Sequence, residues 1–213
     1  MLLSLLSSGD PKSTVISLLI SLPVILFALS IHEVAHGFAA YKCGDRTAYN
    51  LGRLTLNPLK HLDPMGFLCM LVFGFGWAKP VPVNTRYLNP WRQGMFMVSL
   101  AGPASNLIQA FIWLIVLKVF VVMGLHSMVL LQIGVAGVMV NFYLMAFNLL
   151  PLPPLDGGRI LTMLLPYSAA QRFAELENHG MIILVVLLLS GLMSYWMSPF
   201  VSIARSMIGW ALF

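Results

Sequence analysis

The sequence predicts an all-α, polytopic helical membrane protein, and this prediction rests on its composition and its apolar runs. Of the 213 residues, 59% are hydrophobic and 9% are Asp, Glu, Lys or Arg, whereas charged residues make up about 25% of an ordinary soluble domain. The mean hydropathy is +0.89. Several apolar runs also reach the roughly 20 residues that a helix needs to cross a bilayer. We therefore expect about four full spans plus one shorter membrane element.

Four segments are long and apolar enough to span the membrane: residues 15–41, 94–123, 128–150 and 180–197. A fifth apolar run, residues 65–77, is too short to cross comfortably, and glycines and prolines interrupt its continuation. Irregular backbone at membrane depth is tolerated only where protein or a water-filled cavity satisfies its polar groups. The fifth run is therefore expected to form a re-entrant or membrane-surface element.

Both ends of the chain are expected to lie at the membrane surface. The first 14 residues lack a basic region and contain Gly9, Asp10 and Pro11, which favours a short interfacial helix over a cleaved signal peptide. The tail, residues 199–213, is amphipathic enough to lie on the surface. Without repeats or an appended soluble domain, residues 1–213 are interpreted as one domain, with a core at about 15–165 and an accessory span and tail at about 178–213.

The distribution of basic residues predicts how the chain is oriented. The loop at 124–127 has no Lys or Arg, whereas seven lie between the first two spans: Lys42, Arg46, Arg53, Lys60, Lys79, Arg86 and Arg92. Cytoplasmic loops carry an excess of Lys and Arg. Residues 42–93 and 151–179 are therefore expected on the cytoplasmic side, with both ends of the chain outside.

Charge and cysteine content exclude two other classes of protein. The net charge is +5, from 12 Lys and Arg against 7 Asp and Glu, but the basic residues are scattered between apolar spans and form no patch typical of nucleic-acid binding. Cys43 and Cys69 have no CxxC spacing, so neither a disulfide framework nor a thiolate zinc site is indicated.

Three ionisable residues, His32, Glu33 and His36, lie close together near the end of the first predicted span. A charged residue at bilayer depth costs at least about 2.5 kcal/mol on insertion scales, so such a cluster indicates a function. The residues form H-E-x-x-H, which on a helix places both imidazoles on one face, within reach of a single metal ion, with the glutamate beside a bound water. Zinc with three protein ligands keeps a fourth position open for water.

The third protein ligand must come from another segment, and Asp156 in "NLLPLPPLDGGRIL" is the best candidate. It follows the 128–150 span on the expected cytoplasmic side, which is also the side near which His32 and His36 lie. Pro, Asp and Gly are turn residues, so "PPLDGG" alone is equally consistent with a plain turn. Asp63 in "HLDPMG" is the second candidate.

These motifs together resemble the site-2 protease family of intramembrane zinc metalloproteases. The second family motif, N-x-x-P-x-P-x-x-D-G, is present here as Asn148, Pro151, Pro153, Asp156 and Gly157. "AGPASN" at 101–106 is similar to the family's G-P-x-x-N element, and the resemblance runs from about residue 24 to 165. The chain looks like a short form, without the PDZ or cystathionine-synthase-type domain of larger members.

The resemblance implies a three-helix catalytic core and one Zn²⁺ per chain, held by His32, His36 and Asp156. Glu33 would act as catalytic base and acid. Asn148 would hold the substrate or its oxyanion, and Asn106 is placed with it among the substrate-binding residues. For Asn148, an interhelical hydrogen bond is an alternative reading of the residue by itself.

We therefore expect an intramembrane zinc endopeptidase that cuts membrane proteins within or near their spans. The expected partners are a transmembrane substrate and the lipid bilayer, and the expected location is a prokaryotic cell membrane with the active site towards the cytoplasm. The glycine- and proline-rich segment 74–84 could offer a strand edge to an unwound substrate. The alternatives are a metal-ion transporter, which should place ligands along a path and often has internal repeats, and a non-catalytic binder of transmembrane helices. The sequence leaves the substrate and the oligomeric state open.

Overall fold

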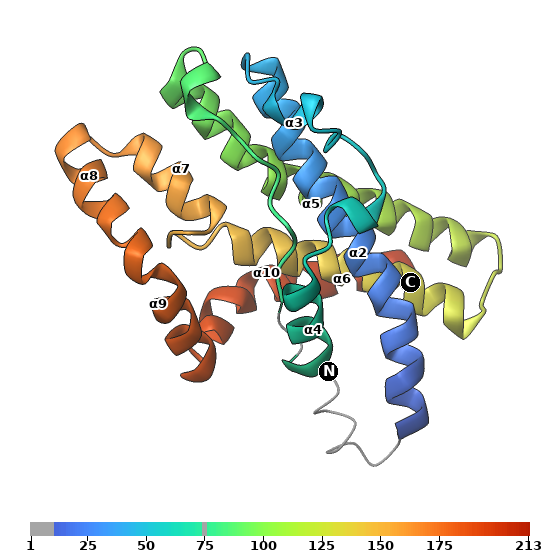
Figure 1. The fold of residues 1–213 in the computed structure, drawn as a ribbon. Helices are drawn as coiled ribbons and strands as arrows, with labels where there is room; N and C mark the ends of the chain where they lie inside the picture. The colour runs from blue at the N-terminus through green and yellow to red at the C-terminus, as the bar shows by residue number, and fades with distance from the viewer. Residues whose placement is uncertain (1–10, 74–75) are drawn as a thin grey trace.

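The computed structural model describes residues 11–73 and 76–213 (Figure 1). Within these ranges the chain is helical and contains no strand, only an isolated antiparallel bridge between Leu62 and Ala78. The predicted all-α class is therefore confirmed. The predicted interfacial helix at the N-terminus falls largely on residues 1–10, outside the described part.

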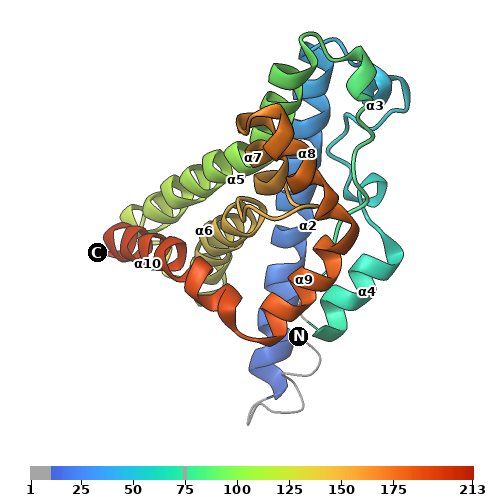
Figure 2. The same ribbon diagram turned by 90° about the vertical axis from the view of Figure 1, so that its left-hand side faces the viewer.

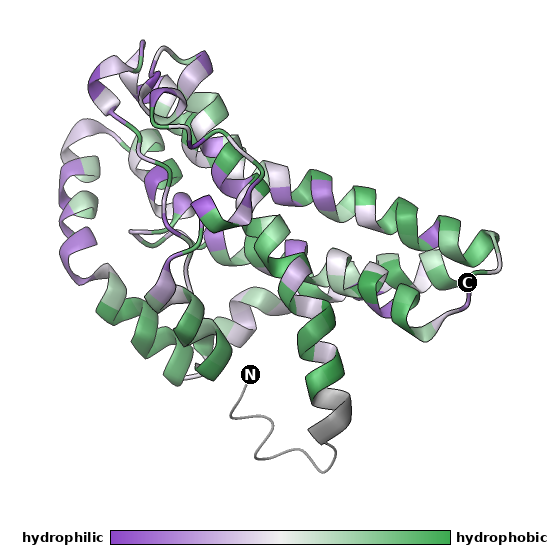
Figure 3. Cartoon of the chain, turned by 45° about the vertical axis from the view of Figure 1, so that its right-hand side comes forward, coloured by the Kyte–Doolittle hydropathy of each residue, from purple (hydrophilic) through white to green (hydrophobic). Residues whose placement is uncertain are grey.

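Three long helices form the centre of the molecule: α2 (Pro11–Lys42), α5 (Trp91–Val122) and α6 (Met128–Asn148). Each contacts the other two. Their segments Val15–Lys42, Trp91–Val122 and Met128–Asn148 are long and apolar enough to cross a membrane, which confirms the first three predicted spans. Figure 3 shows hydrophobic residues along these helices and hydrophilic ones gathered around α3 (Thr47–Asn50) and its neighbouring loops.

The fourth predicted span, 180–197, is wrong as one continuous helix. Helix α9 (Glu177–Leu189) ends before Gly191, whose φ of 77° lies in the left-handed region, and α10 (Leu192–Leu212) leaves at 75° to it. Glycine adopts this conformation without a steric penalty. With 13 residues, α9 is about 20 Å long, too short for a hydrocarbon core of about 30 Å. The pair forms one broken span or a re-entrant loop, so the described chain has three spans, or four with this pair.

The tail 199–213 also differs from its prediction, because it packs against the core. It forms most of α10, which lies beside α5 and α6 (Figure 2). Ala204, Ile208 and Ala211 are buried among Leu117 of α5 and Val138 of α6. The alanines allow close helix approach, which drives association in a membrane. The indole Nε1 of Trp196 donates to the carbonyl oxygen of Ala146 at 2.7 Å and fixes α10 against α6.

Short elements fill the segment between α2 and α5: α3, η1 (Pro58–Lys60), α4 (Pro64–Phe73) and η2 (Thr85–Tyr87). The ten residues of α4 extend about 15 Å, so this helix cannot cross a bilayer, in agreement with the predicted re-entrant or surface element. Asp45 is fully buried and accepts hydrogen bonds from the backbone N–H groups of Thr47 and Asn84. This carboxylate ties the two ends of the segment together.

Candidate metal centre

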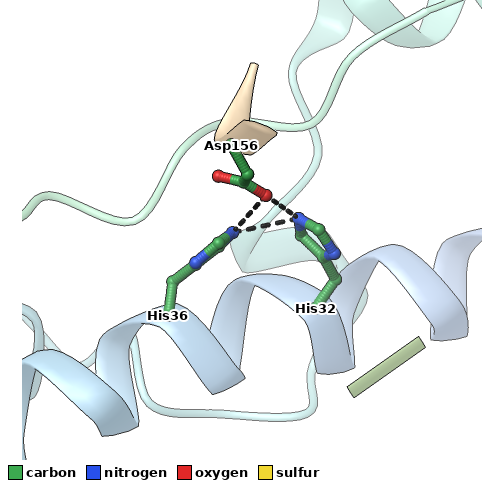
Figure 4. Close-up of side chains that lie close together, drawn as sticks. All are labelled: His32, His36 and Asp156. Atoms are coloured by element: carbon green, nitrogen blue, oxygen red, sulfur yellow. Dashed lines mark hydrogen bonds and ion pairs between the residues drawn. The ribbon is translucent and has the colours of Figure 1, made fainter. Parts of the chain in front are cut away.

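His32 and His36 lie one turn apart on α2, and their imidazoles converge on Asp156 (Figure 4). Asp156 is the first residue of α7 (Asp156–Leu164), which follows the turn after α6. Its Oδ2 atom lies 3.4 Å from Nε2 of His32 and 3.3 Å from Nε2 of His36, and the two Nε2 atoms are 3.0 Å apart. The structure thus brings together the three ligands that the sequence predicted.

These separations fit a tetrahedral zinc site. Ligand atoms about 2.0–2.1 Å from a tetrahedral zinc ion lie about 3.3 Å from one another. The observed separations of 3.0 to 3.4 Å are close to this value. Asp156 Oδ2 is also buried without a hydrogen-bond partner, which fits an oxygen that binds a metal ion or a water.

The outer nitrogen of each ring is already occupied. His32 Nδ1 donates to the side-chain oxygen of Asn106 at 2.6 Å, and His36 Nδ1 donates to the carbonyl oxygen of Val98 at 2.7 Å. A carbonyl oxygen can only accept, so each Nδ1 carries the proton and each Nε2 presents a lone pair. Such outer bonds fix the ring orientation of metal-ligating histidines.

Helix α5 supports the histidines from behind. Asn106 is fully buried and donates from Nδ2 to Asn141 of α6, which in turn donates to the carbonyl oxygen of Gly137. Asn106 does not line the cavity described below, so its position favours holding His32 over the substrate contact expected from the sequence. A Cβ atom at Gly102 would lie 2.5 Å from Cε1 of both His32 and His36. Only glycine leaves room for both rings.

Asp156 is positioned by contacts at both ends of α7, one with the end of α6 and one with α5. A Cβ atom at Gly157 would lie 2.3 Å from the carbonyl oxygen of Leu149, so α7 starts directly against the end of α6. At the other end of α7, Arg92 of α5 donates from Nε to the carbonyl oxygen of Met163 at 2.7 Å and from its guanidinium to that of Leu165. The arginine supplies partners for carbonyls that a helix end leaves free.

The second candidate ligand, Asp63, is wrong as a ligand in this structure. Its Oδ1 accepts from the backbone N–H of Gly66 at the start of α4, and it does not join the only metal-binding group found in the described residues.

A cavity of about 320 Å³ opens beside the three ligands. Glu33 and Asn148 line it, as expected of catalytic and substrate-binding residues, together with six residues between Gly76 and Val83 on one side and residues of α7 and α9 on the other. Glu33 Oε2 accepts from the backbone N–H of Val81 at 2.8 Å. The Asn148 side chain donates to the carbonyl oxygen of Leu144 within its own helix and makes no interhelical bond to any residue that the structure describes.

Sequence reasoning missed Ser99, which lies one turn before Gly102 on α5. Its side chain is buried and lines the cavity, and its Oγ has no hydrogen-bond partner in the described structure. It shares one stripe of α5 with Gly102 and Asn106, and this spacing was the signal that could have identified it.

The chain is similar to a peptidase family and to proteins named as putative zinc metalloproteases. The model of peptidase family M50 matches residues 120–191, which include Asn148 and Asp156. "Putative zinc metalloprotease YwhC" of Bacillus subtilis (strain 168) is 42% identical over 189 residues, covering 86% of this chain and 86% of that protein. "Putative zinc metalloprotease MJ0611" of Methanocaldococcus jannaschii is 33% identical over 153 residues, covering 71% of this chain and 73% of that protein. No solved structure matches the chain.

Proposed function

Because the chain belongs to peptidase family M50, the site-2 protease family, we propose that it is a zinc metallopeptidase that cleaves membrane proteins within or near their transmembrane segments. One observation carries the proposal: His32, His36 and Asp156 converge beside Glu33 in a cavity between helices long and apolar enough to span a membrane. A peptide bond that reaches this cavity meets metal ligands and a potential base together.

Glu33 is the proposed catalytic base and acid. When bound, zinc would polarise the substrate carbonyl and lower the pKa of a water towards about 7. Glu33 then takes a proton from the attacking water and returns it to the leaving amine. The bond from Val81 N–H to Oε2 holds the carboxylate at the cavity wall, which leaves the other oxygen available for the proton.

Asn148 is the proposed hydrogen-bond donor to the developing oxyanion. Its side-chain amide has two N–H groups, and the bond to the carbonyl oxygen of Leu144 uses one of them. The second can point to the cavity that Asn148 lines. A preorganised donor of this kind stabilises charge that appears only in the transition state.

Of the predicted segment 74–84, residues 74–75 lie outside the described part of the chain, and residues 76–83 contain the proposed contact for an unwound substrate. A helical substrate must first break its internal hydrogen bonds before attack, and pairing with exposed backbone would compensate for them. Pro80 and Pro82 have no backbone N–H, and the N–H of Val81 donates to Glu33. A substrate strand therefore has to pair with the backbone of the residues on either side of these three. Normal cleavage after proline scanning of Ala78 and Val83 would argue against this contact.

The active site is proposed to face the cytoplasm of a prokaryotic cell. The ligands lie near the Lys42 end of α2 and next to α7, which adjoin the loops rich in Lys and Arg. The relatives named above come from a bacterium and an archaeon.

The test is bound zinc per chain and cleavage of a model single-span substrate, for the wild type and for Glu33→Gln. We expect about one zinc in both proteins and a loss of about 100- to 10,000-fold in cleavage by the variant. Glu177→Gln, which removes an exposed acid from α9, should cleave normally. Zinc in both proteins with equal cleavage would contradict the role of Glu33.

This experiment, together with a zinc-uptake measurement, separates the alternatives. Zinc retained without cleavage by the wild type would favour a non-catalytic binder of transmembrane helices. A metal-ion transporter would need ligands along a path, whereas the described residues hold a single group of three metal-binding side chains. Zinc uptake into vesicles by the wild type would support the transporter.

A further inference from the structure

We propose that Arg159 selects the substrate by charge, favouring a span with Asp or Glu beside the scissile bond and disfavouring one with Lys or Arg there. The inference rests on the proposed peptidase function, for which it names a substrate class.

Arg159 lies on α7, three residues after Asp156, and lines the same cavity as the metal ligands. Its side chain is exposed. In the described structure its guanidinium makes no ion pair. Asp156, the nearest acidic residue in the sequence, pairs with His32 and His36 instead. Its backbone N–H makes the ordinary helical bond to the carbonyl oxygen of Leu155, the residue directly before α7, and in the described structure the side chain of Arg159 makes no hydrogen bond. Arg159 therefore does not orient Asp156 and is free to meet a substrate.

The charges around the cavity favour an incoming carboxylate. Arg159 is the one lysine or arginine among the described residues that line it, against the carboxylates of Glu33 and Asp156. A divalent zinc ion would shift this balance from −1 to +1, with both histidines neutral. Most of the remaining lining is apolar, including Leu144, Phe147 and Leu184, and charges interact more strongly where water is displaced.

The guanidinium also has the right shape for such a partner. Its planar fork of N–H donors matches a carboxylate with two parallel hydrogen bonds. The same group repels an ammonium or another guanidinium, and repulsion of the wrong partner contributes to specificity.

This repulsion would discriminate among membrane proteins. The cytoplasmic ends of transmembrane helices are usually flanked by Lys and Arg. With the active site towards the cytoplasm, Arg159 would disfavour these common span ends and admit the less common ones that carry Asp or Glu. Substrate choice would then depend on one side chain beside the cut.

The experiment uses a model single-span substrate whose cleavage site is first mapped by mass spectrometry. Glu, Gln or Lys is placed singly at the four positions on each side of the scissile bond, and kcat/KM is measured in detergent for wild type, Arg159→Gln and Arg159→Glu. Arg172→Gln, which removes an exposed arginine of α8 (Tyr167–Glu175) that does not line the cavity, is the matched control.

We expect wild type and Arg172→Gln to prefer Glu over Lys by about tenfold or more at one or two positions. Arg159→Gln should lose this preference, with similar kcat/KM for the Glu, Gln and Lys substrates, and Arg159→Glu should reverse it. Binding can be measured without turnover in the Glu33→Gln background. There, Glu substrates should bind more tightly than Lys substrates when Arg159 is present, and this difference should be lost when Arg159→Gln is added.

Cleavage that is independent of substrate charge in the wild type would overturn the inference and leave the peptidase function intact. An equal loss of cleavage of all substrates by Arg159→Gln would also overturn it, because Arg159 would then be structural. If the wild type cleaves no member of the series, the proposed function fails and this inference fails with it.

Discussion

The two sides of the metal centre differ in how their polar groups are satisfied. Behind the histidines, Asn106 and Asn141 form a continuous chain of hydrogen bonds from His32 to the backbone of α6. On the cavity side, Ser99 Oγ and Asp156 Oδ2 have no hydrogen-bond partner in the described structure. The satisfied side holds the ligands in place, and the unsatisfied side presents groups to a metal ion and a substrate. The groups that fix the histidines and the groups that can bind a metal ion or a substrate therefore lie on opposite sides of the two imidazole rings.

Gly102→Ala should have the largest effect, because it disrupts the supporting side directly. Its Cβ would lie 2.5 Å from Cε1 of both imidazoles, so at least one ring must move. Misplacement of a catalytic group by about 1 Å can cost about 100-fold in rate. We expect loss of most bound zinc and at least this loss of cleavage, measured by metal analysis and turnover.

The control for this substitution is Gly209→Ala on α10, where an added Cβ meets no atom within 4 Å. It should keep zinc and activity. Full zinc occupancy in Gly102→Ala would show that the histidines tolerate a shift, contrary to the rigid support inferred here.

A pair of asparagine substitutions separates the two sides. Asn106→Leu removes the acceptor of His32 Nδ1–H, and loss of such an outer partner lowers metal affinity or activity about 10- to 100-fold. Asn148→Leu leaves the ligands untouched and should keep zinc affinity, while kcat falls about 100- to 1,000-fold through loss of an oxyanion donor. Zinc affinity is measured by competition with a chelator, and kcat at saturating zinc.

The two results are informative only in combination. If both substitutions lowered zinc affinity equally, Asn148 would belong to the supporting side. If Asn106→Leu lowered only kcat, its expected role as a substrate-binding residue would be right after all.

Arg92→Met should have the smallest effect, because it acts on Asp156 through the far end of α7. The substitution removes both bonds to the carbonyl oxygens of Met163 and Leu165, and a hydrogen bond to a charged group contributes about 1.5–3 kcal/mol. We expect a lower Tm and a smaller loss of zinc affinity than with Asn106→Leu. Arg86→Met, at an exposed position, is the control, and an equal Tm for both variants would contradict the role of Arg92.

The sequence alone identified the elements whose signals are local. His32, Glu33 and His36 could be predicted together because their spacing puts them on one face of one helix. The first three spans could be predicted because uninterrupted apolar length is what a bilayer requires. Asp156 could not be predicted from its local sequence, which is equally consistent with a turn. Its prediction as a ligand depended on the expected topology and on the complete motif.

Only the tertiary structure decided which apolar surfaces meet. Lipid and protein interiors are similarly apolar, so hydropathy could not show that the tail of α10 packs against α5 and α6, or that the chain bends at Gly191. The same limit applies to polar partners. That Asn106 supports His32, that Val81 N–H holds Glu33 and that Ser99 faces the cavity depends on distances between segments far apart in the chain. Spacing along the sequence fixes which side chains share a helix face, but the packing of helices fixes what that face touches.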